Sequence, residues 1–71
     1  MAVYIDCERN PYHHMLMSHM VADTLDELHA MAQRLGLQRC WFQVFRNGTP
    51  HYDICQSKRT LALSLGAVEI N

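Results

Sequence analysis

The chain has 71 residues, of which 49% are hydrophobic and 18% are charged, and its formal net charge is −1. This length accommodates one domain, so a single domain over residues 1–71 is expected, and the composition is typical of a globular protein rather than a disordered one. No basic run is longer than Lys58-Arg59 and no apolar stretch has the length of a membrane span, so neither duplex nucleic acid nor a membrane is expected as a partner.

The first part of the chain predicts two strands joined by a loop. Residues 2–6 have the pattern of a short buried strand that ends on Asp6. Residues 7–14 contain the turn signal Asn10-Pro11 and are expected to form a loop. The apolar residues 15–22 are rich in Met and contain Val, and we expect them to form a strand.

A helix over residues 24–35 is the best-defined element of the sequence. Thr24 and Glu27 have the spacing of a capping box, and Gly36 stands where a left-handed C-cap is expected. Apolar residues recur on one helical face, at Leu25, Leu28, Ala32 and Leu35.

The next segment predicts a hairpin. Residues 40–45 are aromatic and β-branched, and Asn47-Gly48 is a strong signal for a two-residue hairpin loop. Such a loop would pair Val44 with His51. It would also place His51 and Asp53 on one face of the second hairpin strand.

The end of the chain predicts a second helix and a final strand. Ser57 is a candidate N-cap for a helix over residues 58–65, in which Leu61 and Ala62 would face inward. Residues 67–70 follow as the last strand.

These elements predict an α/β or α+β fold with one mixed sheet of four or five strands and two helices. The strand-helix-strand units over residues 15–45 and 50–70 are short enough to be βαβ crossovers. Ligands of such sheets bind at the carboxyl ends of the parallel strands, and we expect Asp6 and Asp23 at those ends.

Histidines and carboxylates gather near the predicted strand ends. Asp6, Asp23 and Asp53 are candidate metal ligands, and His19 and His51 are candidate acid–base groups. His51 and Asp53 lie two residues apart on a strand, so their side chains project to one face about 7 Å apart. The alternatives are structural: Asp6 as a turn former, Asp23 as part of the first helix start, and the His51–Asp53 pair as a solvated face.

Two cations lie in the first turn of the second predicted helix. Lys58 and Arg59 follow Ser57 at a position where positive charge opposes the helix dipole. A bound phosphate group would offset them, and this makes them candidate ligand-binding residues. Solvent-exposed cations are the alternative.

Several motifs together resemble those of a known family. They are Val3-Tyr4-Ile5-Asp6, residues 15–24, Glu27-Leu28-His29, Trp41-Phe42-Gln43, His51-Tyr52-Asp53-Ile54, Ser57-Lys58-Arg59 and Gly66-Ala67-Val68-Glu69. The pattern is similar to that of a small bacterial and phage family catalogued only as a domain of unknown function, and it covers nearly the whole chain. The resemblance implies a phage or prophage accessory protein. The chain departs from the family pattern at Cys7, where an acidic residue is typical, and near His13, where a glycine is typical.

Two functions fit these observations. In the first, the His/Asp site binds a divalent metal or a phosphate-bearing small molecule, with metal-assisted phosphoester hydrolysis as its chemistry. Mn or Mg suits the carboxylates and Zn suits the histidines. In the second, the chain is a non-enzymatic phage protein that binds and inhibits a host defence protein.

The setting is expected to be the cytoplasm of the bacterial host cell. The chain opens on a strand pattern rather than a signal peptide, and Cys7, Cys40 and Cys55 include no CxxC pair. We therefore expect free, buried thiols. Because so small a core leaves little stability to spare, a homo-oligomer is also expected.

Overall fold

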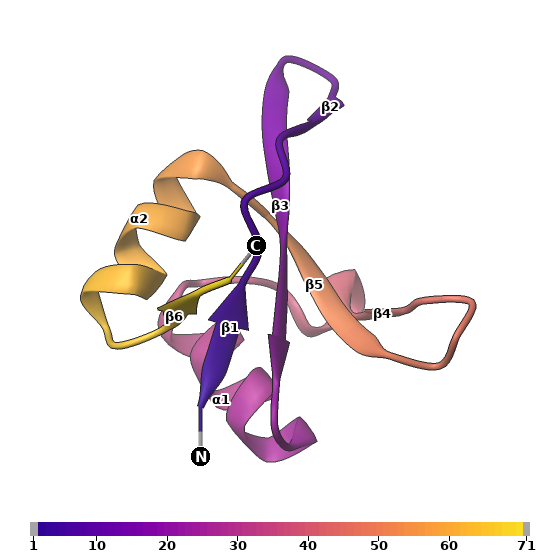
Figure 1. Ribbon diagram of the computed structural model, residues 1–71, viewed down its shortest axis with the longest axis vertical. Coiled ribbons are helices and arrows are strands. Elements are labelled where there is room, and N and C mark those ends of the chain that lie inside the picture. The colour runs from indigo at the N-terminus through magenta and orange to yellow at the C-terminus, as the bar shows by residue number, and fades with distance from the viewer. Residues whose placement is uncertain (1, 71) are drawn as a thin grey trace.

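A long central strand organises the molecule. In the structure, a computed structural model that describes residues 2–70, the elements in chain order are β1 (Val3–Ile5), β2 (Asn10–Tyr12), β3 (Met15–Ala22), α1 (Leu25–Arg34), the 3-10 turn η1 (Arg39–Trp41), β4 (Gln43–Val44), β5 (Pro50–Cys55), α2 (Gln56–Ser64) and β6 (Val68–Glu69). β3 pairs antiparallel with β1 and β2 on one side and with β5 on the other. β6 adds to β1 in parallel, so the sheet is mixed and has the order β4-β5-β3-β1-β6 (Figure 1).

The predicted fold class is confirmed: the chain forms a mixed sheet with two helices, an α+β arrangement. The predicted loop over residues 7–14 is wrong in part, because it contains β2. Pro11 lies in this strand, which pairs only with β3, and a proline is tolerated at such an edge because it has no N–H to donate. The β2–β3 hairpin projects beyond the helices (Figure 1).

Helix α1 begins and ends as predicted. The hydroxyl of Thr24 accepts the backbone N–H of Glu27 and donates to the Glu27 carboxylate, 3.2 and 2.9 Å away. Gly36 follows the last turn with a φ of 77°, in the left-handed region. Leu25 is the exception to the predicted apolar face, since it lies in the first turn and is half exposed.

Helix α2 begins two residues earlier than predicted. Cys55 rather than Ser57 is its N-cap residue, because β5 runs directly into the helix. Ala62 is fully buried, as predicted, but Leu61 is 41% exposed.

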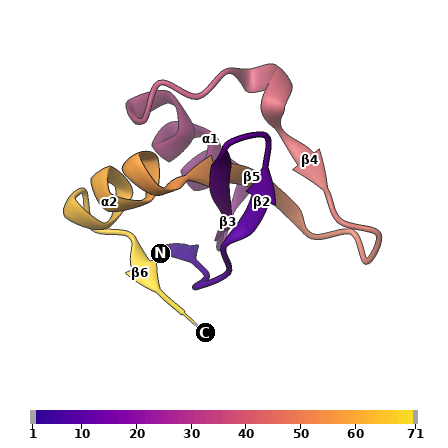
Figure 2. The ribbon, with the colours of Figure 1, turned by 90° about the horizontal axis from the view of Figure 1, so that it is seen from above.

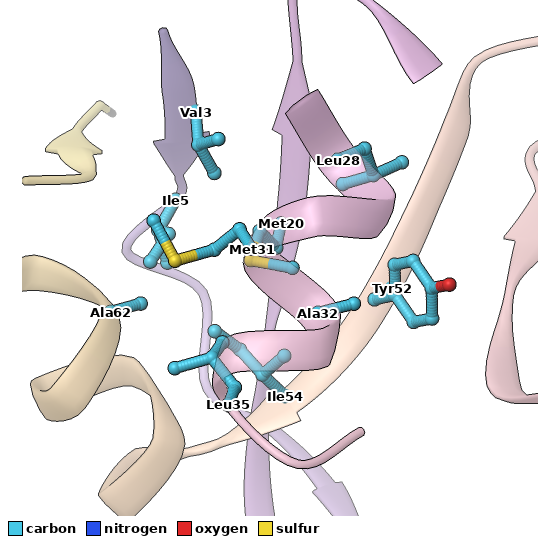
Figure 3. Close-up of a cluster of buried hydrophobic side chains, with 10 residues drawn as sticks. All are labelled: Val3, Ile5, Met20, Leu28, Met31, Ala32, Leu35, Tyr52, Ile54 and Ala62. Carbon is cyan, nitrogen blue, oxygen red and sulfur yellow. The ribbon is translucent and has the colours of Figure 1, made fainter. Parts of the chain in front are cut away.

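Both helices cover the same face of the sheet. Val3, Ile5, Met20, Tyr52 and Ile54 project from β1, β3 and β5 toward α1 and α2 and form one buried cluster with them (Figure 3). The helical members of that cluster are Leu28, Met31, Ala32, Leu35 and Ala62. The opposite face of β3 and β5 is covered by no helix of the described chain, and it carries the alternate residues of these strands.

The hairpin around Asn47-Gly48 forms, but its predicted register is wrong by one residue. Val44 pairs with Pro50, and Gln43 pairs with His51. The N–H of Gly48 donates to the carbonyl of Phe45 at 2.8 Å, and Gly48 has a φ of 91°. This is a three-residue loop with a left-handed glycine, the next most common hairpin connection after the two-residue loop.

The strand predicted over residues 40–45 is reduced to β4, because the chain first forms η1. Figure 2, which looks down on the β2–β3 hairpin, shows β4 on one side of β3 and α2 with β6 on the other. Each helix connects strands that are not neighbours, since β5 lies between β3 and β4, and β3 and β1 lie between β5 and β6. The predicted crossovers therefore do not place parallel strands side by side.

Among residues 2–70 no disulfide joins the three cysteines, as predicted, but the prediction that they are buried is wrong. Cys7 and Cys40 are exposed and Cys55 is partly buried. Among the helices of the described residues, none combines the length and the apolar character that crossing a membrane requires.

Replacing Met20 by Ala tests the central position of β3. Met20 is fully buried between the sheet and the helices. Its truncation leaves a cavity and is expected to lower the free energy of unfolding by about 2–5 kcal/mol in urea titrations. The matched control is Met15→Ala in the same strand, where a side chain 46% exposed predicts a loss below about 0.5 kcal/mol. Equal losses for the two variants would contradict this packing.

Candidate functional site

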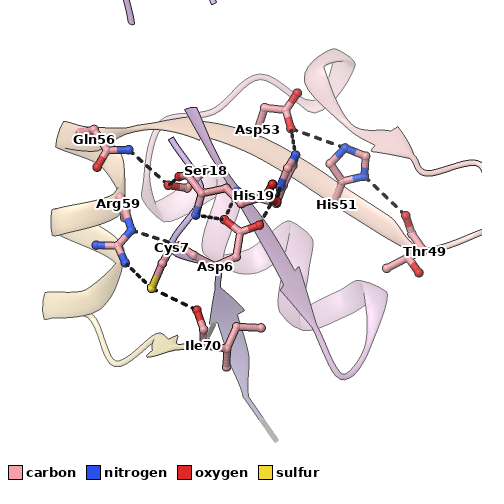
Figure 4. Close-up of polar contacts among 11 residues, drawn as sticks. Asp6, Cys7, Ser18, His19, Thr49, His51, Asp53, Gln56, Arg59 and Ile70 are labelled. Atoms are coloured by element: carbon pink, nitrogen blue, oxygen red, sulfur yellow. Dashed lines mark hydrogen bonds and ion pairs between the residues drawn. The ribbon is translucent and has the colours of Figure 1, made fainter. Parts of the chain in front are cut away.

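Four of the predicted site residues meet on the face of the sheet that the helices leave open. The β3–β5 register places His19 directly opposite Asp53. His51 lies two residues before Asp53 and therefore on the same face of β5. Asp6 follows β1, and its backbone N–H donates to the carbonyl of His19 at 3.1 Å. Figure 4 shows the four side chains directed toward one another.

Asp6 holds one side of the His19 ring. One carboxylate oxygen, Oδ2, lies 2.6 Å from Nδ1 of His19. The other, Oδ1, accepts the backbone N–H groups of His19 and Glu8 at 2.9 and 3.2 Å. Asp6 thus forms a turn, as the structural alternative for this residue predicted. It also fixes the orientation of the His19 imidazole.

Glu8 adds a second carboxylate on this side of the ring. Its Oε2 lies 3.0 Å from Nδ1 of His19, although the side chain is 59% exposed. Asp6, Glu8 and His19 each offer one ligand atom, and these atoms lie within 4.8 Å of one another. This is one position that a metal ion could take.

The other side of the His19 ring faces Asp53. Nε2 of His19 is 3.6 Å from Oδ1 of Asp53, and Nε2 of His51 is 3.5 Å from the same oxygen. This oxygen is buried and makes no hydrogen bond to any residue between 2 and 70. Two imidazole nitrogens therefore point at one buried carboxylate oxygen, which is a second position for a metal ion.

Phe45 packs against both histidine rings. It stacks on His51 with centroids 3.6 Å apart and an interplanar angle of 8°, and it meets His19 edge-on at 5.1 Å. The Nδ1 atom of His51 faces the carbonyl of Thr49 at 3.5 Å. The corrected hairpin register, which the sequence signal missed by one residue, explains why Phe45 reaches the site.

The site favours the charged forms of Asp6 and His19. Burial by itself would lower the pKa of His19, but the hydrogen bond to Asp6 and the charges of Asp6, Asp53 and Glu8 outweigh it and raise the pKa above its ordinary value. For Asp6, burial would raise the pKa, but hydrogen bonds from the backbone and side chain of His19 outweigh it and lower the pKa. The two groups form an ion pair on the sheet.

A cleft of about 570 Å³ opens beside this site. It lies between the β2–β3 hairpin, the outer edge of β5 and η1. His19 and Asp53 are part of its lining. Most of the other lining residues are apolar or aromatic, and the full set is Asn10, Pro11, Tyr12, Met15, Met17, Leu37, Cys40, Trp41, Gln43, Ile54, Cys55 and Lys58. The volume is in the range of small-molecule sites.

The two predicted phosphate-binding cations have different positions. Lys58 lines the cleft. Arg59 instead pairs with Glu69, and its Nε donates to the backbone carbonyl of Asp6 at 3.3 Å. Arg59 thus connects α2, β6 and the end of β1, while Lys58 is the cation that faces a potential ligand.

Asp23 is not part of the group. Because β1 and β3 are antiparallel, Asp23 lies at the opposite end of β1 from Asp6. There it accepts hydrogen bonds from the backbone N–H of Ala2 and the hydroxyl of Tyr4, 2.9 and 3.2 Å away. The prediction that Asp6 and Asp23 share one edge of the sheet is therefore wrong.

The Asp6–His19 pair predicts a specific pH dependence of stability for the metal-free protein. A raised His19 pKa stabilises the fold fully below its ordinary value of 6.5, and this contribution is lost as the pH rises through the folded pKa. A lowered Asp6 pKa stabilises the fold above its ordinary value of 3.8, and that contribution is lost as the pH falls through the lower folded pKa. In urea titrations with EDTA, the difference in unfolding free energy between the wild type and His19→Gln should therefore be largest between these values. A difference independent of pH would contradict the pairing.

Comparison with known protein families matches residues 3–71 to the family described as "Protein of unknown function (DUF4031)". No curated protein matches the chain, and no solved structure matches it. Since the family match spans nearly the whole chain, the protein belongs to the DUF4031 family.

Proposed function

We propose that the protein binds one divalent metal ion between Nε2 of His19, Nε2 of His51 and Oδ1 of Asp53. The observation that supports this proposal best is the Asp53 oxygen, which is buried, lacks a hydrogen bond to any described residue and faces both imidazoles. A buried carboxylate oxygen without a hydrogen bond is costly to the fold. A cation at this point would supply the missing interaction.

Two of the three separations in this group are close to those around a metal ion. Zinc bonds of about 2.0–2.1 Å in tetrahedral geometry separate two ligand atoms by about 3.3 Å. The two separations from Asp53 Oδ1, 3.6 and 3.5 Å, need a small contraction to reach this value, and the two Nε2 atoms, which are more than 4.8 Å apart, would have to close by a larger amount around the ion. The Nδ1 atoms also have acceptors behind them, the Asp6 carboxylate and the more distant Thr49 carbonyl, as metal-bound histidines usually do.

The alternative position beside Asp6 and Glu8 fits less well. Both Asp6 oxygens already accept hydrogen bonds from His19, and Oδ1 accepts a further one from Glu8. An ion bound there would have to push Oδ2 and Nδ1 apart from 2.6 Å. Asp6 therefore acts in this proposal as the partner that orients His19 rather than as a direct ligand.

Two imidazoles and one carboxylate favour zinc among the expected metals, since Mg prefers oxygen ligands alone. Three protein ligands leave at least one coordination position for water or a substrate oxygen. A bound ion would supply an activated water or polarise a phosphoryl oxygen, and metal-assisted phosphoester hydrolysis is the activity we propose for it. His19 and His51 would then serve as ligands instead of acid–base groups.

The proposed setting is a phage or prophage accessory protein in the bacterial cytoplasm. The sequence resemblance supports the first part. The thiols of Cys40 and Cys55, which form no disulfide within residues 2–70, support the second, since accessible thiols persist in a reducing compartment.

A second candidate function, binding to a host protein, is favoured by one observation. Large apolar side chains more than 40% exposed are found on the β2–β3 hairpin and on η1 and β4, namely Tyr12, Met15, Leu16, Trp41 and Val44. Such side chains are typical of protein contacts, including contacts in a homo-oligomer. This function requires no metal, so the experiment below separates the two.

Metal binding is tested by equilibrium dialysis against zinc followed by elemental analysis, with thermal unfolding in parallel. We expect about one zinc per chain and, at free zinc near 100 times Kd, a stabilisation of about 2.7 kcal/mol, which raises Tm by about 10 °C or more in a domain of this size. Asp53→Asn and His51→Gln should each abolish the Tm increase.

Two controls accompany this experiment. His14→Gln, in the exposed turn between β2 and β3, should keep both zinc and the Tm increase. Glu8→Gln should also keep them, whereas loss of zinc in Glu8→Gln with retention in Asp53→Asn would place the ion on the Asp6 side. No bound zinc in the wild type would refute the metal site.

A further inference from the structure

The cleft beside the proposed metal site is lined both by metal-ligand candidates and by exposed aromatic side chains. Its lining includes His19 and Asp53, two of the three proposed metal ligands. The lining also includes the aromatic residues Tyr12 and Trp41, which are 59% and 49% exposed. Trp41 comes from η1 and Tyr12 from β2, so the aromatic rings approach the cleft from two separate elements.

Trp41 is held in position by the backbone around it. Its N–H donates to the carbonyl of Gln38 at 3.0 Å, and the N–H of the following residue, Phe42, donates to Arg39 at 3.2 Å. Phe42 packs on Tyr52 and His29 and lies under the Arg39 guanidinium. The 3-10 turn is therefore anchored to the core through Phe42, while the neighbouring indole remains half exposed at the cleft.

Lys58 gives the cleft a positive charge without a counterion. It lies in the first turn of α2, which contains no acidic residue. Its ammonium group makes no hydrogen bond or ion pair with any residue from 2 to 70, in contrast to the neighbouring Arg59, which pairs with Glu69. The N-terminus of α2 disfavours a cation, whereas the C-terminal end of α1 at Gly36, beside which the Lys58 ammonium lies, favours one. An anion bound in the cleft would give this ammonium a direct charged partner.

We propose that the cleft binds a mononucleotide, with the base stacked on Trp41 and the phosphate between Lys58 and the metal ion. This inference rests on the proposed metal site and adds the ligand class. An exposed indole is the side chain best suited to stack on a heteroaromatic base, and it does so without requiring a particular base. The cleft volume of about 570 Å³ holds one nucleotide rather than an extended strand.

The chain has one tryptophan, so its fluorescence reports directly on the proposed stacking. AMP is titrated into zinc-loaded protein and into EDTA-treated protein, with excitation at the red edge of the indole absorption. We expect AMP to quench Trp41 and to bind more tightly to the zinc-loaded form. Adenosine should quench with lower affinity, and ribose 5-phosphate should not quench. Calorimetry with Trp41→Leu should show the loss of AMP binding.

Lys58→Met tests the phosphate contact. Removing a charge-assisted contact should weaken AMP binding about tenfold or more and leave the affinity for adenosine unchanged. The matched control is Arg34→Met, which removes a cation from the last turn of α1, outside the lining of the cleft, and should leave both affinities unchanged.

The outcomes separate this inference from the proposed metal site, because zinc binding is measured without nucleotide. If zinc binds and millimolar AMP neither quenches nor binds, the nucleotide inference is wrong and the metal site stands. If Lys58→Met leaves AMP affinity unchanged, the inference is also wrong. If zinc fails to bind but AMP binds the EDTA-treated protein in a Lys58-dependent way, the ligand class stands and the metal site does not.

Discussion

The antiparallel pairing of β3 with β5 is the constraint on which the site depends. It places His19 opposite Asp53 and, through the alternation of side chains along β5, brings His51 to the same face. A slip of one residue in this pairing would send every one of these side chains to the opposite face, into the helical layer. The core prevents such a slip, because Met20, Tyr52 and Ile54 occupy the alternate positions and are buried under α1 and α2. Core packing and site geometry are thus two consequences of one register.

The one-sided arrangement of the helices explains why so small a chain can carry polar groups at its centre. The buried apolar cluster lies on one face of the sheet, where α1 and α2 pack on the strands. The other face holds histidines and carboxylates, which contact one another and pack against Phe45. Asp6 has several structural roles on this face. It follows β1, and its carboxylate accepts the backbone N–H of Glu8 and fixes the orientation of the His19 ring.

Local sequence signals predicted the elements well and their assembly less well. Thr24, Glu27 and Gly36 define α1 by short-range chemistry, and they lie in the structure as predicted. Asp23 was misplaced because strand direction depends on long-range pairing: an antiparallel β1–β3 pair separates the two aspartates that a parallel pair would have brought together. The hairpin register failed for a related reason, since Asn47-Gly48 suits both a two-residue and a three-residue loop. Phe45 reaches the histidines because of that register. The cleft depends on β2, a strand that no local sequence signal identified.

The central claim is that the two imidazole Nε2 atoms and the Asp53 carboxylate form one metal site. Anomalous diffraction at the zinc edge from crystals grown with zinc tests it most directly. We expect a single peak about 2.0–2.1 Å from Nε2 of His19, Nε2 of His51 and a carboxylate oxygen of Asp53, with Asp6 still bonded to Nδ1 of His19. A peak between Asp6 and Glu8, or no peak on this face of the sheet, would contradict it.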